Sequence, residues 1–115
     1  MMLLAVLGLS ACGTKVQPPD FQVTQATTAV SQAESVGAYE SAPVELEAAR
    51  AKLAQAKQAL QQMDNLTAQR LADEATADAN LAEAKARTAK SRKSVEALKE
   101  GIRTLQEEVD RKSAR

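Results

Sequence analysis

The chemistry that this chain offers is concentrated in its single cysteine, Cys12. Residues 1–9 form a short apolar run, and the small residues Ser10 and Ala11 separate that run from the cysteine. Small residues fit a narrow peptidase cleft, and a thiol can carry a diacylglycerol group as a thioether. We therefore interpret Leu9-Ser10-Ala11-Cys12 as a bacterial lipobox, with signal cleavage between Ala11 and Cys12 and with diacylglycerol and an N-acyl chain on Cys12.

The alternative interpretation of this region is a short buried apolar segment with an incidental cysteine. The run is too short to cross a membrane, since a transmembrane helix needs about 20 apolar residues, and polar sequence follows at once, as expected after a cleavage point. Two or three acyl chains on Cys12 would anchor the protein stably, whereas a single chain binds reversibly. Gly13 rather than Asp follows the cysteine, which favours an outer-membrane location facing the periplasm, by resemblance to enterobacterial sorting.

Two clusters of charged residues further along the chain could suggest binding sites. The first cluster is a basic run: Lys85, Arg87, Lys90, Arg92 and Lys93. At about 100° per residue, only Lys85 and Arg92 share a helix face. We therefore expect these side chains to be solvated around the helix rather than to form a phosphate or glycan site. An acidic cluster could suggest a cation site, but no histidine or glycine-rich loop accompanies it. We therefore expect simple solvation of an outer face at Asp73, Glu74, Asp78 and Glu83.

The composition argues against several functional classes. The chain has 15 basic and 15 acidic residues and no histidine, and this balanced charge does not favour nucleic acid as a partner. No disulfide can form if the only cysteine is acylated. The sequence offers no histidine base, no free thiol and no phosphate-cradling loop for catalysis. We expect a protein that is not an enzyme and that has neither a metal nor a cofactor.

The elements that must position these groups are helices. Ala, Glu, Gln, Lys and Arg, all strong helix formers, dominate the sequence after Cys12, and aromatic residues make up only 2% of the chain. This predicts an all-α fold: a helical hairpin or three-helix arrangement with a long, coiled-coil-like third helix. We divide the chain into a signal peptide (1–11), a lipidated N-terminus with a Pro-containing tether (12–20), a helical domain (21–112) and a C-terminal tail (113–115).

Capping and turn residues place three helices in this domain, at about residues 21–37, 43–63 and 66–111. Asp20 is the expected N-cap of the first helix and Gly37 its stop. Ser41 offers a cap for the second helix, whose first turn suits Pro43. Asp64 breaks the chain after the second helix and can cap the third.

Apolar residues at alternating steps of three and four line each helix. On the first helix they are Val23, Ala26, Val30, Ala33 and Gly37. On the second helix they are Leu46, Ala49, Leu53, Ala56, Leu60 and Met63. The third helix has an alanine seam at Ala68, Ala72, Ala75, Ala79, Ala82, Ala86 and Ala89. Small residues allow close helix packing, although alanine is also simply a common helix former. Tyr39 could plug the end of the bundle.

A second line of residues on the third helix predicts an interaction surface. It runs through Ala77, Leu81, Ala84, Thr88, Ser91, Val95, Leu98, Ile102, Leu105 and Val109. If the second helix folds back on the third, it reaches only to about Arg87, so the end of this line has no partner within the chain. Its β-branched residues alternate with leucines, which favours parallel two-stranded pairing. The candidate partner-binding residues are Val95, Leu98, Ile102, Leu105 and Val109. Whether the first helix packs beside the second or along the third stays open.

Several short segments resemble a known family. They are Ala-Glu-Ser-Val-Gly-Ala (33–38), Ala-Pro-Val-Glu-Leu (42–46), Ala-Ala-Arg-Ala-Lys-Leu (48–53), Leu-Ala-Asp-Glu-Ala (71–75) and Asp-Ala-Asn-Leu-Ala-Glu-Ala (78–84). Together they resemble the small Ala-rich bacterial envelope lipoproteins of the domain-of-unknown-function 4398 family. That family often has a tyrosine directly before the Ala-Pro pair, where this chain has Ser41. The resemblance implies a helical architecture and an envelope location, and it implies no activity.

These observations lead to one functional hypothesis and two alternatives. We expect a non-catalytic outer-membrane lipoprotein that acts as a periplasmic helical scaffold or adaptor in the cell envelope. Its partners would be the membrane, through the lipid anchor, and either a second copy in a parallel homodimer or another envelope protein. The alternatives are a peptidoglycan-associated spacer or peptidoglycan-binding lipoprotein, which no motif supports, and a regulator of an envelope enzyme.

Overall fold

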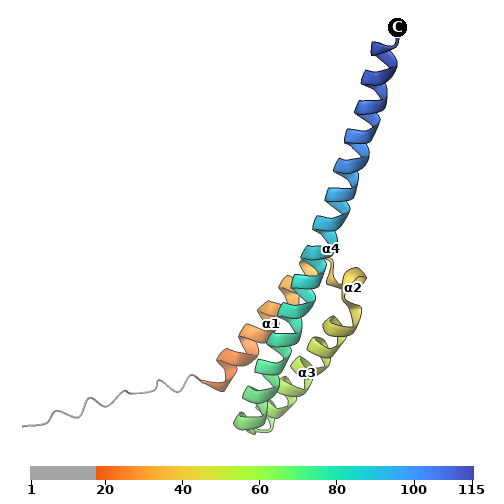
Figure 1. Ribbon diagram of the computed structural model, residues 1–115. Helices are drawn as coiled ribbons and strands as arrows, with labels where there is room; N and C mark the ends of the chain where they lie inside the picture. Colours follow the sequence, from red (N-terminus) through yellow and green to blue (C-terminus); the bar gives the residue numbers. More distant parts are fainter. Residues whose placement is uncertain (1–17) are drawn as a thin grey trace, which may run out of the picture.

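The computed structural model describes residues 18–115, and every regular element in that range is a helix. The helices are α1 (Pro19–Ser35), α2 (Ala38–Ser41), α3 (Pro43–Gln61) and α4 (Asn65–Ser113). α1, α3 and the first half of α4 form a three-helix bundle, and the second half of α4 projects from it (Figure 1). The predicted all-α arrangement with a long final helix is confirmed.

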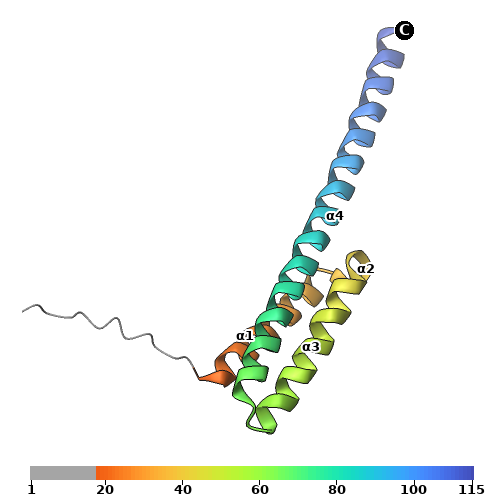
Figure 2. The same cartoon turned by 60° about the horizontal axis from the view of Figure 1, so that its bottom comes forward.

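The sequence left open whether the first helix packs beside the second or along the third, and the structure shows that α1 packs mainly along α4. α3 runs antiparallel to α4, whereas α1 runs in the same direction as α4 (Figure 2). α1 packs mainly along α4 and less extensively against α3. The chain therefore enters the bundle at one end, and the tip of α4 lies beyond the other end.

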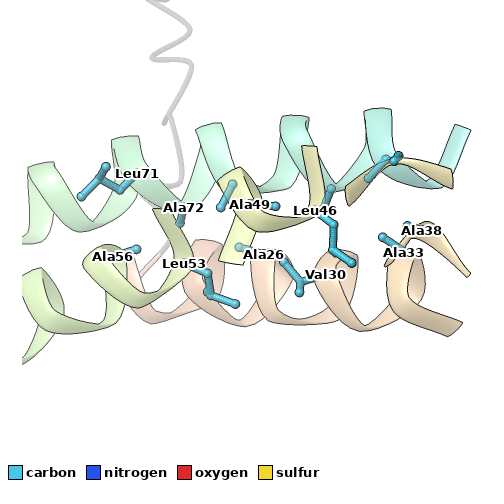
Figure 3. Close-up of a cluster of buried hydrophobic side chains, with 14 of the residues drawn as sticks. Ala26, Val30, Ala33, Ala38, Leu46, Ala49, Leu53, Ala56, Leu71 and Ala72 are labelled. Atoms are coloured by element: carbon cyan, nitrogen blue, oxygen red, sulfur yellow. The ribbon is translucent and has the colours of Figure 1, made fainter. Parts of the chain in front are cut away.

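The bundle packs around alanine. The predicted alanine seam of α4 is buried from Ala68 to Ala86, and Ala89 is half-buried. Because a methyl group takes little room, helices lined by alanine can approach to the short end of the usual range of about 8–10 Å. The largest fully buried side chain is Leu46, which is 1% exposed. Figure 3 shows Leu46, Val30 and Leu53 among the alanines between the helices.

The starts of the first two long helices differ from the predictions. α1 begins at Pro19, two residues earlier than predicted, because a proline fits the first turn of a helix without losing a hydrogen bond. Asp20 is consequently not the N-cap but an acidic residue of the first turn. α3 begins at Pro43 as predicted, but its N-cap is Ala42. Ser41 instead ends α2, a single turn that the sequence analysis did not predict.

The turns that end α1 and α3 both use left-handed backbone. Gly37 has φ +85° and stops α1 as predicted, although the last helical residue is Ser35. α3 ends at Gln61, and Met63 lies in the following turn with φ +61° and 85% exposure. The inclusion of Met63 in the apolar seam was therefore wrong, because the turn rotates its side chain to solvent.

The long helix is capped as the sequence predicts. The carboxylate of Asp64 accepts a hydrogen bond from the backbone N–H of Thr67 at 3.2 Å. α4 then runs without interruption for 49 residues, about 74 Å at 1.5 Å per residue. It begins one residue earlier and ends two residues later than the predicted range, at Asn65 and Ser113.

Candidate interaction surface on the projecting helix

The two halves of α4 have different surroundings. Ala86 is the last fully buried residue of the helix, and every residue from Lys90 onward is exposed. We call residues 90–113 the arm, which is about 36 Å long. As predicted, the bundle supports the helix only to about Arg87, because the first turn of α3 lies beside Lys85.

The arm keeps its helical form without tertiary support. Helix nucleation is costly but propagation is not, and the bundle has already nucleated α4. Ion pairs along the arm add about 0.2–0.5 kcal/mol each. They are Lys99–Glu96 at 3.2 Å, Arg103–Glu100 at 2.6 Å, Arg103–Glu107 at 3.4 Å, Arg111–Glu108 at 3.9 Å and Lys112–Glu108 at 3.4 Å. These pairs also keep most of the arm's circumference polar.

One face of the arm is apolar, and we call it the apolar stripe. The stripe consists of the five predicted partner-binding residues, which are 48% to 65% exposed: Val95, Leu98, Ile102, Leu105 and Val109. An open groove on this face is lined by Ile102, Leu105 and Val109 with two polar neighbours. Within residues 18–115, no segment of the chain covers the stripe.

The apolar stripe continues onto the outer face of the bundle. Leu81 is 48% exposed, as much as Val95 and Ile102 in the arm. The smaller residues of the same line are also exposed or half-exposed: Ala77, Ala84, Thr88 and Ser91. At about 100° per residue, this line lies roughly 160° around α4 from the alanine seam. The face that α1 and α3 leave free is therefore continuous with the free face of the arm.

The flanks of the apolar stripe have few charges. The positions beside its core are Ser94, Lys99, Gly101, Gln106 and Glu108, and all are exposed. Both of the charged residues pair with residues of their own helix, Lys99 with Glu96 and Glu108 with Lys112. Two of the flanking residues, Ser94 and Gly101, are small and uncharged, and small residues allow another helix to approach closely.

The basic run does not converge on one site. Lys85 pairs with Glu45 of α3, and the hydrogen bond from its ammonium group lowers the pKa of the Glu45 carboxyl. Arg87 pairs with Glu83, one turn earlier on α4, at 2.7 Å. Lys90 and Lys93 instead border a shallow surface pocket near Gly37. The five basic side chains are all exposed and lie on different sides of the helix.

Two members of the acidic cluster, Glu74 and Asp78, pair with α3, so the prediction that they only solvate an outer face was wrong. Lys52 of α3 lies 2.7 Å from Asp78 and 3.6 Å from Glu74, and the hydrogen bond to Asp78 is the main reason why the pKa of Lys52 is raised. Asp73 is exposed and Glu83 pairs with Arg87. No three His, Cys, Asp or Glu side chains of the described residues are grouped in a way that could hold a metal ion. The role of Lys52 could not be predicted from spacing along one helix, because its partners lie on another helix.

A second ion pair that the sequence analysis missed links α1 to α3. Arg50 contacts Glu34 of α1 and Glu47 of its own helix, each at 2.6 Å. The hydrogen bond to Glu34 is the largest of the causes that raise the pKa of Arg50. Lys52 and Arg50 thus fix α3 to each of its two neighbours.

Two further surface features also differ from the sequence analysis. Tyr39 is 60% exposed, so it does not plug the bundle. An open groove that the sequence analysis missed lies between α1 and α4, lined by Phe21, Thr76 and Glu83 among others. Most of its lining side chains are polar, and no pattern of apolar spacing would have found it.

The predicted lipobox lies outside the part of the chain that the structure describes. Ala11 and Cys12, the predicted cleavage and lipidation residues, precede residue 18, as do the signal peptide and most of the tether. Among residues 18–115, no helix combines the length and the hydropathy that a membrane span requires.

The family of the chain follows from its helical region. No curated protein and no solved structure matches the chain. Residues 21–98 match a family that is described as a domain of unknown function, DUF4398. The matched region covers the bundle and ends within the arm, at Leu98. Because it spans more than half of the chain, the protein belongs to the DUF4398 family.

Proposed function

We propose that this protein is an outer-membrane lipoprotein that acts as a non-catalytic helical scaffold or adaptor in the periplasm. In this proposal acyl chains on Cys12 hold it to the membrane, the bundle is its rigid base, and the arm presents the apolar stripe to a partner.

The observation that carries the proposal is the apolar stripe on the arm. Its five large side chains are about half to two-thirds exposed, and the bundle covers none of them. Exposed apolar patches rimmed by polar residues commonly mark interaction sites. An arm that served only as a spacer would have no need of apolar residues on one continuous face.

The direction of the chain supports the anchored arrangement. The start of α1, which follows most of the proposed tether, lies at the end of the bundle opposite the arm, because α1 and α4 run in the same direction. An anchor at Cys12 would therefore leave the arm free to point away from the membrane surface.

The charged side chains of the bundle support a structural role. Lys52, Arg50 and Lys85 each join two helices through carboxylates, and side chains that pair in this way are not available to a substrate. We therefore assign them to the packing of the base.

The anchoring part of the proposal can be tested by lipid labelling in cells. The wild-type chain should incorporate a labelled fatty acid and fractionate with the outer membrane, and Cys12→Ala should lose both properties. Gly13→Asp is the matched control, because it leaves the thiol in place and should change only the membrane in which the labelled protein is found. An unlabelled, uncleaved wild-type chain in the cytosol would contradict the proposal.

The adaptor part needs a separate measurement. A photo-crosslinking residue at Leu98 should capture a discrete protein product in intact cells, whereas the same residue at Glu100, on the opposite face of the arm, should not. Equal yields at both positions would contradict an interaction face. Muropeptides attached to the protein after lysozyme digestion would favour the peptidoglycan-associated spacer instead.

A further inference from the structure

We propose that the partner of the apolar stripe is a second copy of this chain, paired in parallel so that α4 packs against α4 from Ala77 to Val109. The inference rests on the proposed function for its orientation, since two chains anchored in one membrane have their arms pointing the same way. It goes beyond the proposed function in two ways: it identifies the partner as a second copy, and it extends the contact from the arm to the exposed face of α4 on the bundle.

The residue types of the stripe fit a copy of themselves. Val95, Ile102 and Val109 occupy one core position of a heptad repeat, and Leu98 and Leu105 occupy the other. β-branched residues at the first position with leucines at the second are the combination that favours a parallel two-stranded coiled coil. A parallel pair places each residue beside its own copy, so β-branched layers alternate with leucine layers.

The length of the free face is sufficient for such a pair. The arm alone offers two heptads of large residues, which is short of the three or four that a coiled coil usually needs. The exposed residues of the same line on the bundle, from Ala77 to Ser91, lengthen the possible contact to about four and a half heptads. They include Leu81, which is as exposed as Val95. A parallel partner uses this whole length.

The bundle does not obstruct the approach of a second copy. α1 and α3 contact α4 on the side of the alanine seam, and the free line lies roughly 160° away around the helix. Two copies can therefore bring their α4 helices together with α1 and α3 of each chain on the outside. No element described in the structure has to move.

The charges beside the seam also permit parallel pairing. In a parallel pair the flanking residues of the arm that meet are Ser94 with Lys99, Gly101 with Gln106 and Glu108 with Ser113, and none of these pairs is of like charge. At the start of the contact Asp73 would approach Asp78 of the copy, but Asp78 already pairs with Lys52 of its own chain at 2.7 Å. Arg87 would approach Arg92 of the copy, but Arg87 already pairs with Glu83 of its own helix at 2.7 Å. Confinement to one membrane surface raises the effective concentration of the two chains and favours their pairing.

Disulfide trapping of the full-length lipoprotein in cell envelopes tests the inference. Single cysteines replace Leu81, Leu98 or Val109, and the thioether on Cys12 leaves the introduced thiol as the reactive one. Each variant should shift on oxidation to the mass of two chains. Leu81 and Val109 are about 42 Å apart along α4, so both can bond to their own copies only in a parallel pair. Glu100→Cys and Glu107→Cys on the opposite face are the controls and should stay monomeric.

A second substitution tests whether the seam is continuous. Leu98→Asp placed in the Leu81→Cys chain should abolish the Leu81 disulfide, because a buried charge in the arm separates the two helices. Ala97→Asp adds the same charge outside the seam and should leave the disulfide intact. Circular dichroism should show equal helix content in both, since neither residue is buried in the monomer.

The outcomes separate this inference from the proposed function. Crosslinking at Leu98 without crosslinking at Leu81 and Val109, or equal crosslinking at Glu100, overturns the parallel pair. Capture of a different protein at Leu98, with no disulfide dimer at any of the three positions, also overturns it but leaves the adaptor function standing. Absence of the lipid label from the wild-type chain, with disulfide dimers still formed by Leu81→Cys and Val109→Cys in a Cys12→Ala background, would overturn the anchored function alone.

Discussion

The two halves of α4 belong to one uninterrupted helix, but the first half packs against α1 and α3 and the second half is exposed to solvent. From Ala68 to Ala86 the residues of the seam that faces the core are alanines, and all of them are buried. From Val95 to Val109 the residues of the apolar stripe are large, and all are exposed. Large side chains are therefore scarce where the helix packs within its own chain and present where it does not.

This difference indicates how each half obtains its stability. Alanine loses no side-chain entropy on folding and lets helices lie close, so the bundle depends on tight packing of small groups and on inter-helix ion pairs. The arm depends on helix propagation and on local ion pairs. The apolar groups of the arm add nothing to the fold of one chain, which leaves them available for a partner.

The largest contrast between the two halves should come from removing a leucine from each. Leu46→Ala should lower the free energy of unfolding by about 2–5 kcal/mol, because it leaves a cavity in the bundle. Leu98→Ala should change the stability of a monomer very little, since Leu98 is 65% exposed. Urea denaturation at two protein concentrations measures both. A large loss in Leu98→Ala that does not depend on concentration would show that the arm contacts its own bundle.

A smaller contrast should follow from enlarging an alanine in each half. Ala75 is fully buried, so Ala75→Leu should cost about 1–3 kcal/mol by forcing the helices apart. Ala97 of the arm is exposed, and Ala97→Leu should be close to neutral. Thermal unfolding followed by circular dichroism provides the comparison, and equal melting temperatures for the two variants would contradict close packing along the alanine seam.

Two glycines should respond in opposite directions. Gly101 lies in the regular helix of the arm, where an added methyl group would meet no neighbouring side chain, so Gly101→Ala should raise helix stability by about 0.5–1 kcal/mol. Gly37 has φ +85°, and Gly37→Ala should cost about 1–2 kcal/mol through left-handed strain. Chemical denaturation measures the free energy of unfolding of both variants. If Gly37→Ala stabilised the protein, the α1–α2 turn would not have a left-handed backbone at residue 37.

The smallest expected effect is a pH dependence at the start of α4. Hydrogen bonds from Thr67 lower the pKa of Asp64 below its ordinary value of about 3.9. The stabilisation is therefore present above about pH 3.9 and is lost as the pH falls through the lower pKa of the folded state. Asp64→Asn keeps an acceptor but does not titrate. As the pH falls from about 6 to about 3, the wild type should lose stability relative to Asp64→Asn. A difference in stability that does not change with pH would contradict a hydrogen bond from Thr67 to the ionised Asp64.

The sequence predicted the parts of the fold that depend on spacing. The step of three and four residues identified the alanine seam and the apolar stripe of the arm, because both depend only on position along one helix. The same reasoning identified Asp64 as a cap, since its hydrogen-bond partner is three residues away.

The features that the sequence analysis missed depend on contacts between helices or on local turn geometry. Lys52 meets carboxylates on another helix, and no spacing rule joins residues that far apart. Met63 falls in register with the seam, but the backbone of the turn has φ +61° and removes it from that face. The course of α1 along α4 could not be predicted either, because the spacing of apolar residues on α1 does not specify which helix it packs against.

Because α1 and α4 run in the same direction, the length of the arm sets how far its tip lies from the start of the bundle. Inserting or deleting one heptad in the arm would move its tip by about 10.5 Å while keeping the same residues on the same side. A change made beyond Val95 would leave the base unaffected, because every residue of the arm from there on is exposed. The reach of this protein can thus be changed by altering the length of one helix.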